Sequence, residues 1–431
     1  MPVSQKILDA ALEAMKDGYV CDSCLGRSVA ELLSGFSNAE RGRVLRTYIA
    51  MLLDAGEEID VDKSNLCGMK FRNAKVEAGK LGKCKICKNF FSERVEELAK
   101  AIAKRTADYE FKTFLMGTIV SAEMAKAEEE AWHSAGVEFV EPIKNEINRE
   151  VGKRVEKLTG KKFDLKEPDI VAIIDFEQNK VSLQVKSLYV YGRYQKLVRG
   201  MPQTRWLCRE CSGKGCPRCK GRGKMYETSV QENIEPPLLK AAKAKASKMH
   251  GSGREDIDVR CLGWRPFILE LVRPMVRKLN LRKLQTQVNK SKKVKVQGLK
   301  FASKKDVEDV KSSRHDKTYR AEVIFEKKID ASKLKLVKAL AGREIGQRTP
   351  RRVAHRRADL VRGRRVKSIS VRKLGPRKLE VKLTGEAGIY VKELISGDDG
   401  RTSPNVAELL GNKVKNIKLD VIKIHCPRGK I

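Results

Sequence analysis

The sequence lacks the long apolar runs that membrane proteins need. None of its apolar stretches approaches the roughly 18 residues of a membrane-spanning helix. Residues 1–18 have instead the pattern of an amphipathic helix that carries Asp9 and Glu13, without the apolar core and cleavage site of a signal peptide. We therefore expect a soluble, cytoplasmic protein that binds no membrane.

Acidic residues are the scarcer charged class. The chain of 431 residues holds 55 Asp and Glu against 91 Lys and Arg, which gives a net charge of +36 and an isoelectric point near 9.8. Such a field attracts polyanions over long range. Because hydrophobic residues make up 41% of the chain, the charge does not imply disorder. We expect a nucleic-acid-binding protein; a generally basic proteome and a membrane surface are the weaker explanations.

Internal repeats and long low-complexity tracts are also absent, and the length favours two to four domains. Residues 1–105 are mostly helical in pattern, and residues 106–206 change to an α/β pattern. Residues 207–235 form a knot rich in Gly and Cys with a linker, and residues 236–431 alternate strand-like runs with Lys-rich connectors. The sequence thus predicts an α+β protein with an N-terminal α/β part and a C-terminal mixed, mainly antiparallel sheet.

Individual elements follow from hydrophobic periodicity and turn residues. We expect helices at 121–132, 143–158 and 331–340, and a helix led by Pro236-Pro237 within 229–249. We expect strands at 111–120, a hairpin of 169–176 with 180–191, and strands at 267–272, 318–325, 368–371, 378–383 and 414–424.

Cysteines occur mainly as Cys-x-x-Cys pairs, which account for eight of the eleven. In a long, Lys-rich cytosolic chain such pairs indicate metal rather than disulfides. Cys208, Cys211, Cys216 and Cys219 lie within twelve residues and among glycines, so that four thiolates can surround one zinc ion; a redox pair is the alternative. A second structural site would combine two pairs across a helical segment, namely Cys21, Cys24, Cys84 and Cys87.

Three polar segments in the C-terminal part are candidates for a site. The first, His250 to Arg260, includes Gly253-Arg254-Glu255-Asp256 and then Asp258; on composition alone a solvated loop is as probable as a site. The second is Thr384 to Ile395, which includes Lys392 and Leu394. In the third, Lys317 to Ala321, Tyr319 stands on a predicted strand. Taken alone, the second and third segments are more often a solvated lysine and a core tyrosine than a site.

A basic run lies between the last two of these segments. Residues 347–359 hold six basic groups in thirteen residues, among them Arg348 and Arg351. A charge run is usually a solvated face, but this density suits binding to backbone phosphates.

Together these segments resemble the archaeal-type tRNA pseudouridine-54/55 synthases, also called the pseudouridine synthase ten family. Several pseudouridine synthase families share Gly-Arg-x-Asp around the essential aspartate. The segments at 168–170, 183–188, 192–196 and 202–206 resemble the THUMP domain, an RNA-binding fold of tRNA-modifying enzymes. The resemblance covers nearly the whole chain in order, and it departs from the family at 262–267, which is tighter and carries Trp264.

The resemblance implies a role for each candidate residue. Asp256 would be catalytic, with Asp258 as second choice, and Tyr319 would stack on the target base. Lys392 would pair with the catalytic carboxylate and Leu394 would flank the pocket. The arginines that would bind substrate are Arg254, Arg348 and Arg351.

The implied reaction isomerises a flipped uridine of the tRNA T-arm, at position 54, 55 or both, to pseudouridine. It needs no organic cofactor, only structural zinc, in two sites, and it requires tRNA but no obligate protein partner. Two rivals remain. A binding module with an inactive C-terminal domain is disfavoured by Asp256, Tyr319 and Lys392 together. A THUMP-linked methyltransferase or thiouridine synthase is disfavoured because neither a strand-borne G-x-G-x-x-G nor a P-loop is present.

Overall fold

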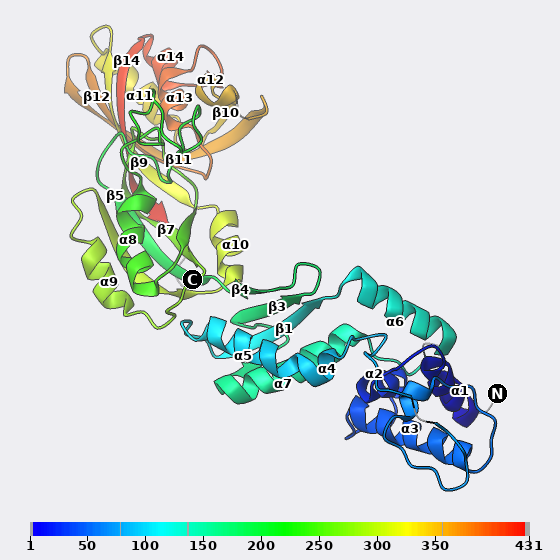
Figure 1. Ribbon diagram of the computed structural model, residues 1–431. Coiled ribbons are helices and arrows are strands. Elements are labelled where there is room, and N and C mark those ends of the chain that lie inside the picture. Colours follow the sequence, from blue (N-terminus) through cyan, green and yellow to red (C-terminus); the bar gives the residue numbers. More distant parts are fainter. Residues whose placement is uncertain (1–2, 78, 136–137, 356, 427–431) are drawn as a thin grey trace. The chain divides into compact units, whose positions relative to one another are not determined.

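A computed structural model describes residues 3–77, 79–135, 138–355 and 357–426. The chain divides into two compact units, Met1–Lys186 and Ser187–Ile431 (Figure 1). Each unit contains a sheet and helices packed on it. No helix within the described ranges is both long and apolar enough to cross a membrane.

The N-terminal unit begins with a helical module. Its α3 starts at a capping box, in which the Ser37 side chain accepts from the Glu40 backbone N–H and the Glu40 carboxylate accepts from that of Ser37. Close contact between α2 and α3 depends on Gly26 and Gly42. A Cβ at Gly26 would collide with the backbone of Asn38 in α3, and one at Gly42 with the backbone of Asp22 in α2. The helices of this module are α1 (Val3–Lys16), α2 (Asp22–Gly26), α3 (Asn38–Asp54) and α4 (Phe90–Glu93).

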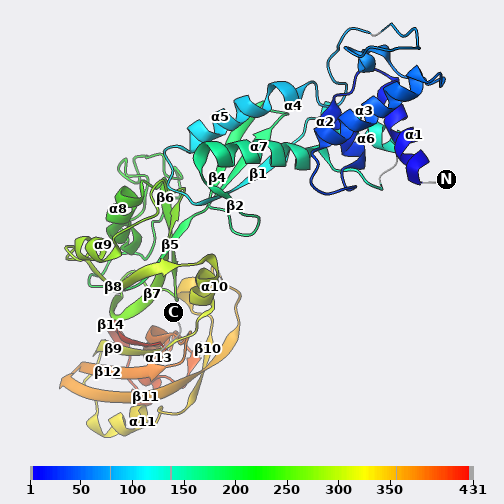
Figure 2. The ribbon, with the colours of Figure 1, turned by 90° about the horizontal axis from the view of Figure 1, so that it is seen from below.

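A small sheet follows in the order β2-β1-β3-β4. Strand β1 runs parallel to β2 and β3, and β3 forms an antiparallel hairpin with β4. Helices α5 and α7 lie side by side against it (Figures 1 and 2), and one buried cluster joins this layer to the helical module. The elements are α5 (Val95–Thr106), β1 (Thr113–Ile119), α6 (Ala122–Ala135), α7 (Ile143–Thr159), β2 (Lys162–Phe163), β3 (Ile170–Asp175) and β4 (Lys180–Val185).

The C-terminal unit is built on a ten-stranded sheet. Its order is β13-β10-β11-β12-β9-β14-β7-β5-β8, with β6 paired to β7, and every pair is antiparallel except β14 with β7. This confirms the predicted mixed, mainly antiparallel sheet. The strands are β5 (Leu188–Lys196), β6 (Ala246–Gly251), β7 (Arg260–Val272), β8 (Val294–Ala302), β9 (Asp316–Phe325), β10 (Glu344–Arg348), β11 (Val361–Gly375), β12 (Lys378–Gly385), β13 (Thr402–Ser403) and β14 (Val414–His425).

Side chains alternate along β5 and β7, so that buried residues lie on both faces of this half of the sheet. Val190, Tyr194 and Phe267 belong to the cluster beneath α8 (Val230–Ala242) and α9 (Leu281–Val288). Tyr191 and Ile268, which point the other way, pack against α10 (Lys304–Ser312). This half of the sheet is therefore enclosed by helices on both sides, which makes it a rigid base for the loop between β6 and β7.

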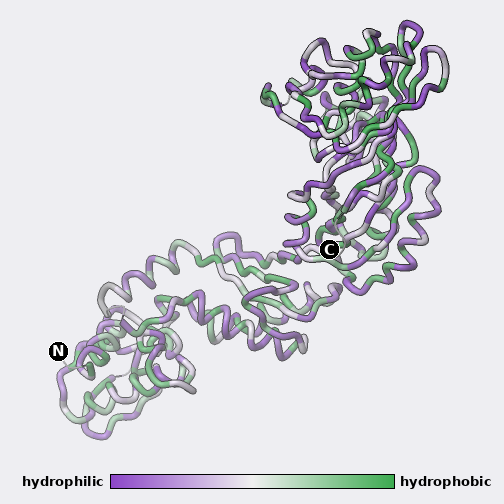
Figure 3. Tube along the Cα trace, turned by 180° about the vertical axis from the view of Figure 1, so that it is seen from behind, coloured by the Kyte–Doolittle hydropathy of each residue, from purple (hydrophilic) through white to green (hydrophobic). Residues whose placement is uncertain are grey.

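The other half of the sheet buries one face. Along β12 the burial alternates, and Figure 3 shows hydrophobic and hydrophilic residues intermixed along the whole chain. The buried face packs on short helices: α11 (Leu334–Lys338), α13 (Val391–Ser396) and α14 (Val406–Leu410).

Several expected elements are displaced in the structure. β5 continues the predicted hairpin in sequence, but it pairs with β7 and β8, so residues 187–206 belong to the C-terminal unit. The boundary expected at residue 206 therefore differs from the structure. Helix α8 begins at Val230, capped by Ser229, and holds Pro236 and Pro237 in its interior rather than at its start. The Lys-rich connector before residue 317 contains β8 and α10.

The core beneath β9 provides a test of this packing. Phe325 is 1% exposed, whereas its neighbour Ile324 is 37% exposed on the other face of the strand. We expect Phe325→Ala to lower the free energy of unfolding of the C-terminal unit by about 3–5 kcal/mol, because it removes buried area and leaves a cavity. Ile324→Ala is the matched control and should cost less than about 1.5 kcal/mol. Urea denaturation of both variants measures the difference, and equal losses would contradict the assigned register.

Candidate active site

The candidate site is a cavity of about 270 Å³ within the C-terminal unit. Its walls come from the loop between β6 and β7, from β7, β9 and β14, from α12 (Arg351–Ala354), and from the segment that leads into α13. Asp256, Tyr319, Lys392 and Arg254 all line it. The structure thus brings together residues that are up to 138 positions apart in the sequence.

A buried ion pair anchors the loop that carries Asp256. Glu255 Oε2 lies 2.9 Å from Nε of Arg265 on β7, and both side chains are 1% exposed. The Tyr194 hydroxyl donates to the same carboxylate at 3.1 Å. Lys196 Nζ lies 3.9 Å from Glu255 and donates to the backbone carbonyls of Asp256 at 3.0 Å and Ile257 at 3.2 Å. The loop is therefore held by both side chain and backbone.

The turn into this loop requires glycine. Gly253 has φ +71°, a conformation that L-residues with a Cβ rarely adopt. Its carbonyl accepts from the Gln203 side chain at 3.0 Å, and the preceding Ser252 carbonyl accepts from Arg265 at 2.9 Å. The Gly-Arg-Glu-Asp segment therefore combines a backbone turn, a buried anchor and an accessible carboxylate.

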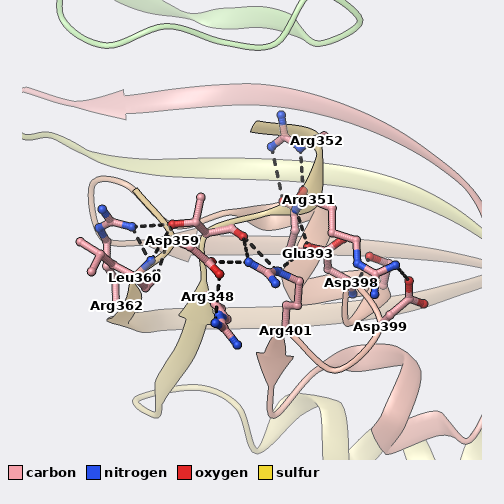
Figure 4. Close-up of polar contacts among 12 residues, drawn as sticks. Arg348, Arg351, Arg352, Asp359, Leu360, Arg362, Glu393, Asp398, Asp399 and Arg401 are labelled. Carbon is pink, nitrogen blue, oxygen red and sulfur yellow. Dashed lines mark hydrogen bonds and ion pairs between the residues drawn. The ribbon is translucent and has the colours of Figure 1, made fainter. Parts of the chain in front are cut away.

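The Asp256 carboxylate faces two cations. Arg352 of α12 donates to Asp256 Oδ1 at 2.8 Å, and Lys392 Nζ lies 3.6 Å from Oδ2. The same guanidinium donates to buried Glu393 at 2.6 Å, as Figure 4 shows. Burial alone would disfavour the charged guanidinium, but Glu393 and Asp256 outweigh it and raise the pKa of Arg352. Arg352 therefore stays cationic and fixes the carboxylate against α13.

Lys392 contacts Asp258 more closely than Asp256. Its Nζ lies 2.7 Å from an Asp258 oxygen. Partial burial would raise the pKa of Asp258, but the hydrogen bond and charge of Lys392 lower it below its ordinary value. Lys392, the expected partner of Asp256, thus bridges two aspartates. The cation closer to Asp256 is Arg352, which the sequence did not distinguish from the other residues of its basic run.

Tyr319 lies on β9 at the base of the cavity and is 9% exposed. Burial raises the pKa of its phenol to about 12. The ring is therefore neutral near pH 7 and is suited to stacking. Beside it, Lys317 on the same strand also lines the cavity, although the sequence analysis did not single it out.

Arg254 and Trp206 form a second surface next to the cavity. The Arg254 guanidinium lies over the Trp206 ring, 6.0 Å from its centroid. A hollow of about 230 Å³ includes both residues and shares Asp256 and Lys392 with the main cavity. An aromatic ring with a cation above it is an arrangement that suits a neighbouring base or phosphate.

The remaining expected residues do not line the cavity. Arg348 pairs with Asp359 at 3.0 Å, and Arg351 pairs with Asp399 at 2.8 Å, both shown in Figure 4. Leu394 is fully buried in the core cluster, because only one face of the short α13 reaches the cavity. These three residues are therefore displaced from the predicted pocket, and the cavity's apolar wall is formed partly by Ile389 and Val391 instead.

Two groups of four cysteines could each hold a metal ion. Within each group all four Sγ atoms lie within 4.8 Å of one another. A tetrahedral zinc with Zn–S bonds of about 2.3 Å places its sulfurs about 3.8 Å apart. The observed Sγ separations are 3.5 Å for Cys21 and Cys87, and 3.7 Å for Cys208 and Cys216. The donor sets therefore fit zinc.

The surroundings of the sulfurs also suit thiolates. Backbone N–H groups of Gly215 and Gly223 donate to Sγ of Cys211 and Cys219, both at 3.2 Å. In the N-terminal unit, Arg27 lies 3.5 Å from Cys24 Sγ. With four thiolates in each group, neither site leaves a coordination position for chemistry.

Comparisons with known proteins agree with this organisation. The family model "Pus10, C-terminal" matches residues 189–425, and the model "Pus10 THUMP domain, archaeal" matches residues 98–175. The THUMP match thus ends before β5. Both models describe parts of one class of enzyme, the pseudouridine synthases.

Full-length relatives specify the family. A protein named tRNA pseudouridine synthase Pus10 from Methanothrix thermoacetophila is 41% identical over 100% of this chain and 97% of the relative. Proteins of the same name from Methanopyrus kandleri and Methanocaldococcus jannaschii are 42% and 41% identical, over 97% and 96% of this chain and 98% and 93% of the relatives. The chain belongs to the Pus10 family of tRNA pseudouridine synthases.

The metal sites give one prediction. We expect purified protein to contain about two zinc ions per chain by elemental analysis, because both four-cysteine sets fit tetrahedral zinc. Cys208→Ser should remove one ion and Cys84→Ser the other, since three thiolates close a structural site poorly. Cys67→Ser, an exposed cysteine outside both groups, is the control and should keep two. A single ion that is lost only with Cys208→Ser would rule out the N-terminal site.

The ion pair between Glu255 and Arg265 gives another prediction. Glu255→Ala should lower the free energy of unfolding by about 3–5 kcal/mol, because it leaves Arg265 and Lys196 buried without their carboxylate. The exposed Glu227→Ala should change it by less than about 0.5 kcal/mol. Thermal unfolding of the two variants provides the measurement, and equal melting temperatures would show that the ion pair does not stabilise the fold.

Proposed function

We propose that this chain converts uridine to pseudouridine in the T-arm of tRNA, at position 54, 55 or both, with Asp256 as the catalytic residue. The observation that carries the proposal is the Asp256 carboxylate, which lines the same cavity as buried Tyr319 and accepts from Arg352 at 2.8 Å. Pseudouridine synthase relatives over the full length support the reaction class.

The target uridine must leave its stack to reach this carboxylate, because the cavity is concave and too small for a paired duplex. Tyr319 then stacks on the flipped base, and the apolar side chains Ile389 and Val391 exclude water from the opposite wall. Arg254 and Trp206 bind the nucleotide next to it. These contacts orient the sugar toward Asp256 rather than read the base edge.

The chemistry uses only side chains of this chain. Asp256 either attacks C1′ of the ribose or removes a sugar proton, and in both cases the C1′–N1 bond breaks with its electron pair on the base. The freed uracil rotates, and C5 forms a bond to C1′ as the Asp256–C1′ bond breaks or, on the other route, as Asp256 returns the sugar proton. C5 then loses its proton while N1 gains one. Substrate and product are isomers, so no redox group or organic cofactor enters the balance.

The N-terminal unit has a separate role in the proposal. Its THUMP domain docks the tRNA, and its four-cysteine site, Cys21, Cys24, Cys84 and Cys87, holds the helical module on which docking depends. The positive charge of the chain as a whole supports association with the tRNA backbone. We also propose that the enzyme acts in the cytoplasm without an obligate protein partner.

Replacement of the two aspartates tests the assignment. Asp256→Asn should lower the single-turnover rate on a tRNA transcript more than about 10³-fold while tRNA affinity changes only a few-fold, because it removes the reacting carboxylate and no phosphate contact. Asp258→Asn is the matched control and should lose about tenfold or less, since that carboxylate is 61% exposed and contacts Lys392.

Sequencing of the product after pseudouridine-specific derivatisation maps the modified positions. Pseudouridine at positions outside the T-arm would refute the proposed substrate site. Normal turnover by Asp256→Asn together with loss in Asp258→Asn would move the catalytic role two residues along the loop.

A further inference from the structure

Lys317 is a lysine of the cavity lining on β9. It lies two residues before Tyr319 on β9, so both side chains project from the same face of the strand. Its Nζ donates to the carbonyl of His315 at 2.9 Å, and it pairs with no carboxylate among the residues that the structure describes. An ammonium group has three N–H donors, so two are left for a ligand.

Three other cations that line the cavity are paired with carboxylates. Arg265 is paired with Glu255, Arg352 with Asp256 and Glu393, and Lys392 with Asp256 and Asp258. The neighbouring Asp316 is already paired with Lys367. Lys317 therefore differs from these three cations, because no carboxylate of the described residues forms an ion pair with it.

We propose that Lys317 is a catalytic residue that binds the uracil anion released when the C1′–N1 bond breaks. The inference rests on the proposed function, because it places the target uridine in this cavity. Either action of Asp256 leaves the bonding pair on the base, and the negative charge spreads onto the ring carbonyl oxygens. A fixed ammonium at the wall stabilises this charge more than it stabilises neutral uridine, so it accelerates cleavage.

A backbone phosphate is the other anion that a lysine could bind. The position of Lys317 favours the base, because it neighbours Tyr319, the ring on which the base stacks. Exposed cations suited to phosphates lie at the cavity edge instead, such as Arg254 and Arg357.

The groups around Lys317 predict how this role depends on pH. Burial and the Arg265 guanidinium lower the pKa of Lys317 to about 8, against the opposing influence of Cys261 on β7, Asp316 on β9 and Cys426 after β14. The ammonium form, which is the one that binds the anion, exists below that pKa. The rate of cleavage should therefore fall as the pH rises through about 8 and beyond.

Single-turnover kinetics on a tRNA transcript tritiated at uridine C5 test this role, since C5 loses its hydrogen in the reaction. Lys317→Met should lower the rate about 100-fold or more with tRNA affinity within a few-fold, because the neutral substrate loses little. Lys317→Arg, which stays charged, should recover at least tenfold over Lys317→Met and lose the decline above pH 8. Lys382→Met, an exposed lysine on neighbouring β12, controls for net charge and should match wild type.

Three outcomes would overturn the inference. Wild-type turnover by Lys317→Met excludes a catalytic role, and an unchanged alkaline decline in Lys317→Arg excludes Lys317 as the titrating group. Weaker tRNA binding with a shallower salt dependence and an unchanged rate would identify a phosphate contact. If wild-type protein makes no pseudouridine, or Asp256→Asn stays active, the proposed function itself fails; if both behave as expected, only the role of Lys317 is at issue.

Discussion

The buried pair between Glu255 and Arg265 is the constraint on which the site depends. Two charges removed from water are stable together only when their geometry is good and their remaining polar atoms are satisfied. Tyr194 and Lys196 of β5 help to meet that requirement for Glu255, and the Ser252 carbonyl accepts from Nη1 of Arg265. Because Asp256 directly follows Glu255, every contact that holds the pair also limits where the Asp256 carboxylate can lie.

The anchor also depends on β5, the first strand of the C-terminal unit. The strand supplies Tyr194 and Lys196 from beneath the loop, and its pairing with β7 brings them beside Arg265. A loop tied only by its own turn would leave Asp256 free to reorient. Here the loop is joined to two adjacent strands of an enclosed sheet, so the position of the carboxylate follows from the sheet register.

Most of the charges around the cavity are also held in ion pairs. Glu393 and Asp256 together hold Arg352, and Asp258 holds Lys392, so these cations are neutralised before any substrate arrives. A paired cation orients its partner but adds little attraction for a new anion. Recognition of charge that develops during the reaction is thereby left to a group outside these pairs, which is the position of Lys317.

The sequence predicted features that depend on local spacing. Cys-x-x-Cys pairs and the Gly-Arg-Glu-Asp turn could be identified because a few adjacent residues define them, and the predicted cysteine groupings match the two clusters in the structure. Arg352 could not be distinguished from Arg348 and Arg351 in the sequence. The way the four-residue α12 lies against α13 determines which arginine of the basic run faces the cavity. Leu394 was misplaced for the same reason.

Strand assignment failed where pairing is not local. The periodicity of β5 is that of any half-buried strand, and the predicted hairpin of 169–176 with 180–191 ran on into its first residues. Its partners β7 and β8 lie about 70 to 110 residues later in the chain, so nothing near it in sequence specifies them. Likewise Leu262 to Phe267, where the chain departs from the family pattern, is not a loop but the middle of β7. The shorter segment is accommodated because an extended strand needs no turn there, and this leaves Arg265 pointing at Glu255.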